Sequence, residues 1–591
     1  MVGFLVVLSL FGAQLVRIQG FDATATAETA QKLRTKTEML PAPRGSITDA
    51  DGTVLAASIE RRIVSVNQQA VVEYKKKVNG KLTTVGIEGA IADLSPMLKM
   101  TPEVLRPLLT GDSVYTVVAN NVSPLTWHAI SELGIPGFFS ERSSVRTYPQ
   151  STSAASLVGF VMESQVGGGG VELLFDKVLR GTAGDLAYEV GQDGVRLPYG
   201  YTAEKSAVPG RDVRLTIRND LQWYAQNVLA QKVREVGAQS GTVVVESVKT
   251  GEILALASYP TFDPARLSSA TGSLTNLAFT EVFEPGSTAK VVTAAAALEE
   301  GKVAATTPMI VPYSLRRAGT TFTDSHVHGA EYLTFAGALA ESSNTGIILA
   351  GETMSPATLD KYFRKFGLGE KSGTGFPGES AGLFAAHEDW DGSKRYTVMY
   401  GQGIAITAIQ AASVYQAIAN KGVRLAPVLV DAVTDTGGAF VKEPRAPGKR
   451  VISEKSATAL NEMLEGVVSE NGTAPAAQIA GYRVAGKTGT AYAIKEGGGY
   501  SGYTASFLGF APADDPELVV SVIIQRPVKS HFGGTVAAPV FRDVMTYALQ
   551  NRQVPPTPED TNRPQLALKL ATVPNPYDPA VLRDRGRSAA G

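Results

Sequence analysis

Hydrophobic residues are concentrated at the start of the chain, where residues 1–16 read MVGFLVVLSLFGAQLV with no charge before Arg17. A membrane-spanning helix needs about 20 apolar residues, so this run is slightly short. An uncleaved anchor is the favoured interpretation, because Phe21 and Asp22 interrupt the run without a typical approach to a cleavage site. A cleaved signal peptide is the alternative, with Ala23-Thr24-Ala25 as its small-residue site. We therefore predict a transmembrane anchor at residues 1–18.

Between the anchor and about residue 205 the apolar runs are short. Residues 23–38 are polar and are predicted to form a helical stalk. Asp51-Gly52 separates two short strand-like runs, 46–48 and 54–56, which predicts a β-hairpin. Pro209-Gly210 then marks a boundary. These features predict an elongated mixed α/β domain at residues 19–205.

From residue 211 the pattern changes to longer strands and alanine-rich helices. Strands are predicted at 213–217, 242–247 and 253–259, a helix at 220–236, and a strand pair at 481–493 and 506–524. Strands that flank a mostly helical insertion predict an α+β domain, with an antiparallel sheet flanked by helices, over residues 206–552. Beyond Gln553 the chain has prolines, arginines and little periodicity, so residues 553–591 are expected to be a disordered tail.

Composition narrows the possible functions. The net charge is -1 and no long basic run exists, so nucleic acid is not an expected partner. The chain has no cysteine, which excludes disulfides, thiolate metal sites and cysteine nucleophiles. His326 and His328 have no third ligand nearby in the sequence, so neither a metal nor another cofactor is expected.

Ser287 and Lys290 lie at the start of a predicted helix. Pro285-Gly286 breaks the chain before them, and an alanine-rich run continues to Gly301. Free N–H groups in a first helical turn favour developing negative charge, and positions i and i+3 share one face. A neutral lysine could therefore act as the base for the serine hydroxyl. By itself this spacing is weak, because Ser-x-x-Lys recurs by chance and is more often a capping serine with a solvated lysine.

Two further motifs change this interpretation. Ser342-Ser343-Asn344 follows a predicted helix at 333–341, and Lys487-Thr488-Gly489-Thr490 lies in a strand-like run. In this order the three motifs match the set of penicillin-binding proteins and class A β-lactamases, except that Ser343 stands where the second motif of that set has Asp. A second Lys-Thr-Gly at Lys249 is better explained as a hairpin turn between two strands. Two other Ser-x-Asn matches, at Ser65 and Ser469, do not fit the order or the context.

Beyond these motifs, the chain resembles a class B penicillin-binding protein over nearly all of its length except the anchor and the tail. Residues 211–552 also resemble the transpeptidase domain at 284–287, 324–329, 401–403 and 506–512. The N-terminal part resembles the pedestal, or dimerisation, domain at 44–49, 146–149 and 170–172. Among class B proteins the chain is most similar to the division-specific type.

The resemblance implies a peptidoglycan D,D-transpeptidase that cross-links stem peptides through a serine acyl-enzyme and is trapped by β-lactams. Ser287 would be the nucleophile and Lys290 its base, with backbone N–H groups of Ser287 and Thr490 as the oxyanion hole. Ser342 would relay a proton and Asn344 would hold the substrate amide. The remaining motif would receive the terminal carboxylate of D-Ala-D-Ala, through Lys487, Thr488 and Thr490.

The resemblance also implies partners and a location. The partners would be the stem peptides, the membrane, a polytopic glycan polymerase and other division proteins, and the bulk of a single-pass protein would lie outside the cytoplasm. An elongation-type transpeptidase and a non-catalytic penicillin-binding sensor or division scaffold remain alternatives. A class A β-lactamase is not favoured, because Glu-x-x-Leu-Asn is missing between the second and third motifs. A bifunctional class A protein is not favoured either, because the pedestal motifs stand where its glycosyltransferase would be.

Overall fold

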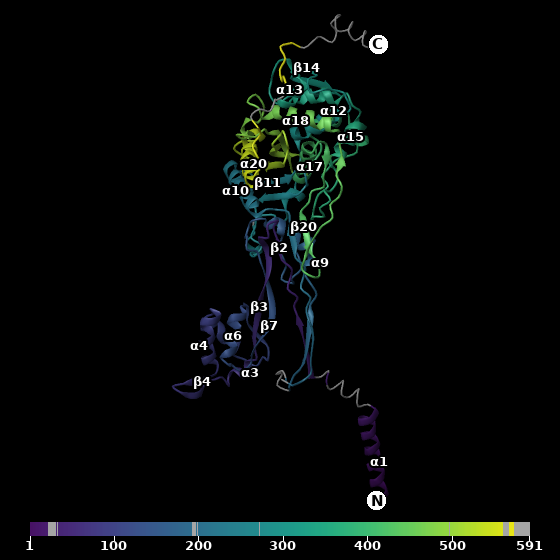
Figure 1. Cartoon of the computed structure of the whole chain (residues 1–591). Coiled ribbons are helices and arrows are strands. Elements are labelled where there is room, and N and C mark those ends of the chain that lie inside the picture. Colours follow the sequence, from purple (N-terminus) through teal and green to yellow (C-terminus); the bar gives the residue numbers. More distant parts are fainter. Residues whose placement is uncertain are drawn as a thin grey trace. The chain divides into compact units, whose positions relative to one another are not determined.

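The computed structural model describes residues 1–21, 31, 34–191, 197, 199–270, 272–495, 497–558 and 566–572. They pack as two units (Figure 1). The first holds Met1–Ser46, Ala57–Thr147 and Lys177–Asp212, and the second holds Ile47–Ala56, Tyr148–Asp176 and the chain from Val213 onward. The sequence assigned both 47–56 and 148–176 to the pedestal, but these segments pack with the second unit.

The N-terminal run forms helix α1 (Val2–Val16), which continues as a π-helical turn, η1 (Arg17–Phe21). The stretch Val2–Gly20 is long and apolar enough to cross a membrane. Much of the predicted stalk, at 23–30, 32 and 33, lies outside the described residues. Its last part is a strand, β1 (Thr35–Leu40), so the predicted helix is wrong there. The strand is held by β8, about 150 residues further along the chain, a pairing that the local pattern could not indicate.

Besides the two-stranded sheet of β4 (Lys75–Val78) and β5 (Lys81–Thr84), the described residues of the first unit form two larger sheets. One has the order β1-β8-β9, with β8 at Gly184–Glu189 and β9 at Thr202–Lys205. In the other, β3 (Val54–Val66) is flanked by β6 (Thr116–Val122) and β7 (Phe138–Thr147). Four helices accompany this second sheet and bury a separate apolar core with it: α3 (Gln68–Val71), α4 (Gly86–Leu98), α5 (Pro102–Leu109) and α6 (Pro124–Glu132).

A five-stranded antiparallel sheet organises the second unit, in the order β12-β11-β25-β24-β23. Its strands β11 and β25 are buried along their whole length, because helices cover both faces. Helices α10 (Asn219–Val236) and α20 (Ala538–Asn551) pack together through stacked Tyr224 and Tyr547, at 4.2 Å between centroids. The strands are β11 (Ser240–Ser247), β12 (Ile253–Tyr259), β23 (Ala485–Ile494), β24 (Tyr500–Ala511) and β25 (Leu518–Gln525). The α+β fold class is confirmed, although the strand predicted at 506–524 is two strands.

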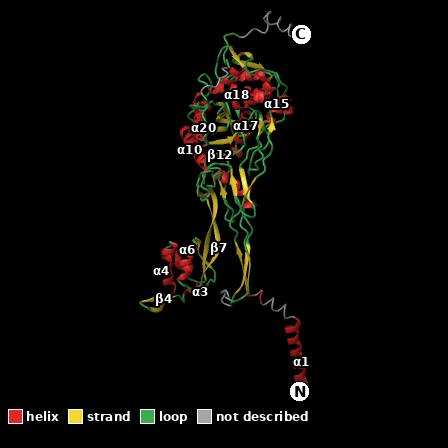
Figure 2. Cartoon of the chain, in the orientation of Figure 1, coloured by secondary structure: helices red, strands yellow, loops and turns green. Residues whose placement is uncertain are grey.

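Between β12 and β23 the alanine-rich pattern predicts mostly helices, but in the structure the helices alternate with long loops and short strands (Figure 2). These helices carry two of the three motifs, because α12 (Lys290–Glu299) and α14 (Asn344–Gly351) begin at them. Other helices of this region are α13 (Phe335–Ala340), α15 (Pro356–Lys365), α17 (Ala408–Ala419) and α18 (Glu454–Val468).

The hairpin predicted at Asp51-Gly52 is confirmed, since β2 (Ile47–Thr48) pairs with the start of β3. The tail does not follow its prediction throughout. Residues 559–565 and 573–591 lie outside the described residues, but 566–572 are ordered. Thr334 donates from its backbone N–H to Leu568 O (3.1 Å) and from its hydroxyl to Ala567 O (2.7 Å). The prediction of disorder is therefore wrong for this stretch.

Candidate active site

Ser287 lies in a short 3₁₀ turn, η3 (Gly286–Ala289), which leads directly into α12. Its side chain is half-exposed, while its immediate neighbours Gly286 and Thr288 are buried. Two contacts from distant segments fix the turn. The Gly286 N–H donates to Gly401 O (3.0 Å), and the Tyr415 hydroxyl of α17 donates to Thr288 O (3.0 Å). The serine is thus presented at the surface from a rigid support.

The turn packs against β23, an edge strand of the five-stranded sheet. This close approach explains two glycines. A Cβ at Gly489 would stand 2.9 Å from Thr288 Cγ2 and 3.0 Å from Pro285 O. Gly286 has φ +52° and would bring a Cβ to 3.0 Å from that of Ala491. Small residues on both sides therefore bring Ser287 beside the third motif.

Lys290 is fully buried, one helical turn after Ser287. Its Nζ donates to the carbonyl oxygen of Ser342, and it also donates to Ser342 Oγ (3.3 Å). Burial lowers the pKa of Lys290 to about 7, against the opposing effect of the Asp324 charge. A large fraction of the amine is therefore neutral at neutral pH. In that state its two N–H groups can bond to Ser342 while its lone pair remains available.

Lys487 is also fully buried, within β23. Its Nζ donates to both Thr488 Oγ1 and Thr488 O at 3.3 Å. Burial lowers the pKa of Lys487 well below its ordinary value, and the charge of Lys290 lowers it further. The resemblance implies that Lys487 receives the terminal carboxylate of the substrate as a positive charge. In the structure, only Thr490 of the three predicted binding residues is half-exposed, and it accepts a bond from Gly533 N–H (3.2 Å).

The second motif is a strained turn held by a buried carboxylate. Ser342 has φ +62°, which is uncommon for a residue with a side chain. Asp324 accepts hydrogen bonds from the Ser343 hydroxyl (2.7 Å), the Thr345 N–H (3.0 Å) and the Asn344 N–H. The Asn344 amide donates to Thr323 O at 2.8 Å. Ser342 and Asn344, the two predicted site residues, are half-exposed on either side of buried Ser343.

Two carboxylates support the candidate active site, although the sequence predicted no role for either of them. Asp324 holds the second motif and is the opposing charge on Lys290. Glu284 is buried and accepts bonds from the Gly403 N–H and the Tyr500 hydroxyl, both at 2.9 Å. Both residues stand inside sequence blocks that resemble the family. The partners named above, however, lie 19 or more residues away in the chain, so the sequence could show that these carboxylates matter but not how.

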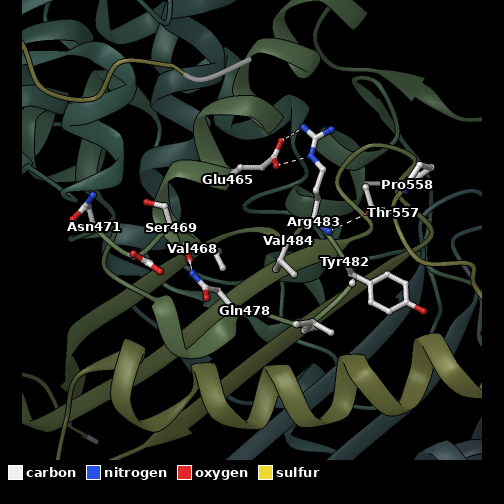
Figure 3. A pocket seen from close by; sticks show the side chains of 13 residues that line it. Glu465, Val468, Ser469, Asn471, Gln478, Tyr482, Arg483, Val484, Thr557 and Pro558 are labelled. Atoms are coloured by element: carbon white, nitrogen blue, oxygen red, sulfur yellow. Dashed lines mark hydrogen bonds and ion pairs between the residues drawn. The ribbon is translucent and has the colours of Figure 1, made fainter. Parts of the chain in front are cut away.

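The competing motifs lie elsewhere. Lys249 is at the turn between β11 and β12, as predicted, and is exposed, in ion pairs with Asp515 (3.2 Å) and Glu517 (2.5 Å). Ser469 lines a cavity of about 720 Å³ beside the Arg483–Glu465 ion pair (Figure 3). None of the residues from the three ordered motifs lines this cavity. Cavity volume therefore does not identify the candidate active site, which is defined by the chemistry of its side chains.

Comparison with known proteins gives matches over both parts of the chain. The profile of the penicillin-binding protein transpeptidase domain matches residues 241–546. The profile of the penicillin-binding protein dimerisation domain matches residues 39–215. Together the two profiles account for most of the chain.

Similar proteins match at full length. Penicillin-binding protein PbpB of Mycolicibacterium smegmatis is 34% identical over 580 residues, which cover 93% of this chain and 89% of the relative. Peptidoglycan D,D-transpeptidase FtsI of Escherichia coli is 30% identical over 528 residues, which cover 88% and 86%. The crystal structure of penicillin-binding protein 3 from Mycobacterium tuberculosis complexed with aztreonam has a TM-score of 0.70 and 31% identity, covering 90% of this chain and 100% of that one.

Proposed function

The chain belongs to the class B penicillin-binding proteins and is a peptidoglycan D,D-transpeptidase, and we propose that it performs this reaction with Ser287 as nucleophile and Lys290 as base. As a member of this family, the chain binds β-lactams and acts on peptidoglycan. A role in division is consistent with relatives named FtsI and PbpB.

The observation that carries the residue assignment is the state of Lys290. A lysine that is fully buried, has a pKa lowered to about 7 and follows a half-exposed serine by three residues has the properties of a general base. A merely structural lysine would be expected to keep its charge and pair with a carboxylate.

In the acylation step, the Lys290 lone pair accepts the Ser287 proton as Oγ attacks the carbonyl carbon of the penultimate D-Ala. The negative oxygen that forms is stabilised by the backbone N–H groups of Ser287 and Thr490. The proton passes from Lys290 through the Ser342 hydroxyl, 3.3 Å from Nζ, to the leaving amine of the terminal D-Ala. Breaking that C–N bond leaves an ester on Ser287. An amine of a second stem peptide then attacks the ester, giving the cross-link and restoring the serine.

Substrate binding uses the free edge of β23 and the second motif. An extended stem peptide can add to this edge through main-chain hydrogen bonds. Asn344 holds the substrate amide. The hydroxyls of Thr488 and Thr490 donate hydrogen bonds to the terminal carboxylate. The negative charge of that carboxylate raises the pKa of buried Lys487, so that Lys487 becomes protonated and carries the matching positive charge.

For the organisation of the chain we propose an anchor at 1–18, a pedestal at 19–205, a transpeptidase domain at 206–552 and a tail at 553–591, with all but the anchor outside the cytoplasm. The apolar helix at Val2–Gly20 supports the anchor. Sequencing the N-terminus of the mature protein tests it, since a new terminus near Thr26 would indicate cleavage.

We further propose that the pedestal docks a polytopic glycan polymerase and other division proteins. The matched arginines Arg44 and Arg146 are buried, and Arg146 donates to Gly45 O (2.7 Å), so they hold the pedestal together and leave docking to other side chains. Reversing the charge of exposed Arg142 should impair wall synthesis in cells without lowering acylation in vitro.

Two assays separate an enzyme from a penicillin-binding scaffold. Labelling with fluorescent penicillin reports acylation, and a cross-linking assay with native stem peptides reports turnover. We expect both from the wild-type chain and neither from Ser287→Ala. Labelling without cross-linking, in the presence of the membrane partner, would support the scaffold.

A further inference from the structure

The hairpin formed by β4 (Lys75–Val78) and β5 (Lys81–Thr84) carries the densest positive charge of the first unit's described surface. Residues 75–84 read KKKVNGKLTT, with four lysines and no acidic residue. The hairpin extends from the helical part of this unit (Figure 1). Neither the catalytic reaction nor the resemblance assigns it a role.

The turn of the hairpin is well defined. Asn79 and Gly80 both have positive φ, at 50° and 82°, as the two central residues of a type I′ turn require. The base is fixed to α4, where Lys76 Nζ donates to both oxygens of Asp93 (2.9 Å) and the Tyr74 hydroxyl donates to Asp93 Oδ2 (3.0 Å). The hairpin is therefore a structured projection whose side chains have defined directions.

Pairing across the strands divides these side chains between two faces. Lys75 lies opposite Thr84, and Lys77 lies opposite Leu82, so these four share one face. The other face carries Lys76, which is bound to Asp93, and at the tip Val78 opposite Lys81. Within the described residues, Lys75, Lys77 and Lys81 form no ion pair. Leu82 is 69% exposed on the face of Lys75 and Lys77, while Lys81 stands beside Val78 at the tip.

We propose that this hairpin docks on the anionic headgroup surface of the membrane in which α1 is anchored. Three uncompensated lysines match anionic headgroups, while exposed Leu82 and Val78 suit the apolar layer just beneath them. An acidic protein surface would match the lysines but gives less reason for the exposed leucine among them.

The anchored topology proposed above provides the membrane. Thirteen residues separate Phe21 from Thr35, so β1 begins within about 50 Å of the end of the helix, whatever path the linker takes. The first unit is therefore tethered close to a bilayer. A weak electrostatic contact suffices under such tethering, because the second binding event is intramolecular.

The absence of cysteine in the chain permits a direct test. Thr84→Cys places a single reporter on the face of Lys75 and Lys77 without removing a proposed contact. The full chain, labelled there with an environment-sensitive fluorophore, is reconstituted in vesicles of phosphatidylcholine alone or with phosphatidylglycerol. A control reporter at Val441→Cys stands on the exposed strand β21 (Phe440–Lys442) of the second unit, also beside a lysine.

The emission of the Thr84 reporter should shift to the blue in anionic vesicles only, and high salt should reverse the shift. The Val441 reporter should not respond. Changing Lys75, Lys77 and Lys81 together to Glu should lower the docking constant by roughly two orders of magnitude or more, whereas the matching change to Arg should retain it. Unaltered penicillin acylation shows that the second unit of the variants folds, and an unaltered circular dichroism spectrum shows the same for the first unit.

Equal emission in both kinds of vesicle, or a shift that survives the change to Glu, would overturn the proposal. A response that appears only when an acidic membrane protein is added would replace it with protein docking. Flotation of the vesicles separates this inference from its premise. If the chain does not float with either kind of vesicle, the anchor fails and the hairpin proposal falls with it, whereas flotation without a shift overturns the hairpin proposal alone.

Discussion

The pH dependence of acylation should reveal the state of Lys290. Burial lowers the pKa of this lysine from 10.5 to about 7, so that about half of the molecules hold a neutral base at pH 7. A lysine with the ordinary value would be neutral in only about one molecule in three thousand at that pH. The protein environment thus increases the concentration of competent enzyme by roughly three orders of magnitude.

The direction of the effect follows from the role of the group. A base acts in its deprotonated form, so the second-order rate of acylation by penicillin should rise with pH through about 7 and level off above it. Between pH 6 and pH 8 the rate should increase about tenfold. Stopped-flow or quenched acylation at substrate concentrations far below saturation measures this rate for the free enzyme.

Other ionisable groups need a control. Burial also raises the pKa of the Glu284 carboxyl, whose bonds hold the turn before Ser287. Glu284→Gln should leave the midpoint near 7, since the titrating base is still present. Lys290→Met should abolish the pH-dependent acylation altogether. A rate that is flat between pH 6 and pH 8, or a midpoint that moves with Glu284, would refute the assignment of Lys290 as the base.

Further expectations concern the two lysines of the site and their matched control. Lys487→Ala should slow acylation by orders of magnitude, while Lys249→Ala, at an exposed hairpin turn, should be nearly silent; comparable losses in an acylation assay would contradict the motif assignment. Lys290→Met should raise the thermal midpoint at pH 7. A lysine whose pKa is depressed in the folded state lowers the free energy of unfolding, by up to about 4 kcal/mol at that pH. The wild-type protein should regain this stability as the pH rises toward 10.5. An unchanged or lower midpoint at pH 7, measured by thermal unfolding, would show that the hydrogen bonds to Ser342 outweigh the buried amine.

Much of the second unit could be predicted because its signals are local. The pattern of Pro285-Gly286 followed by alanines specifies where a helix begins, and the buried strands read as apolar runs. The three motifs could be selected from their decoys by order and context. The structure agrees with the predicted turn at Lys249 and brings Lys290 together with Ser342.

The missed features depend on contacts between distant parts of the chain. Strand β1 looks helical by composition, and only its pairing with β8 makes it a strand. The stretch around Leu568 has no periodicity of its own, yet it pairs with the backbone of Thr334. Likewise, nothing local shows that Lys487 is buried, because its burial follows from the packing of helices on the sheet.

The identity of the residue that β-lactams acylate tests the central claim most directly. The full chain is incubated with penicillin, digested, and analysed by mass spectrometry for a peptide that carries the intact penicilloyl mass. The account predicts a single adduct on Ser287 and no adduct in Ser287→Ala. An adduct on another serine, or labelling that persists in the variant, would contradict it.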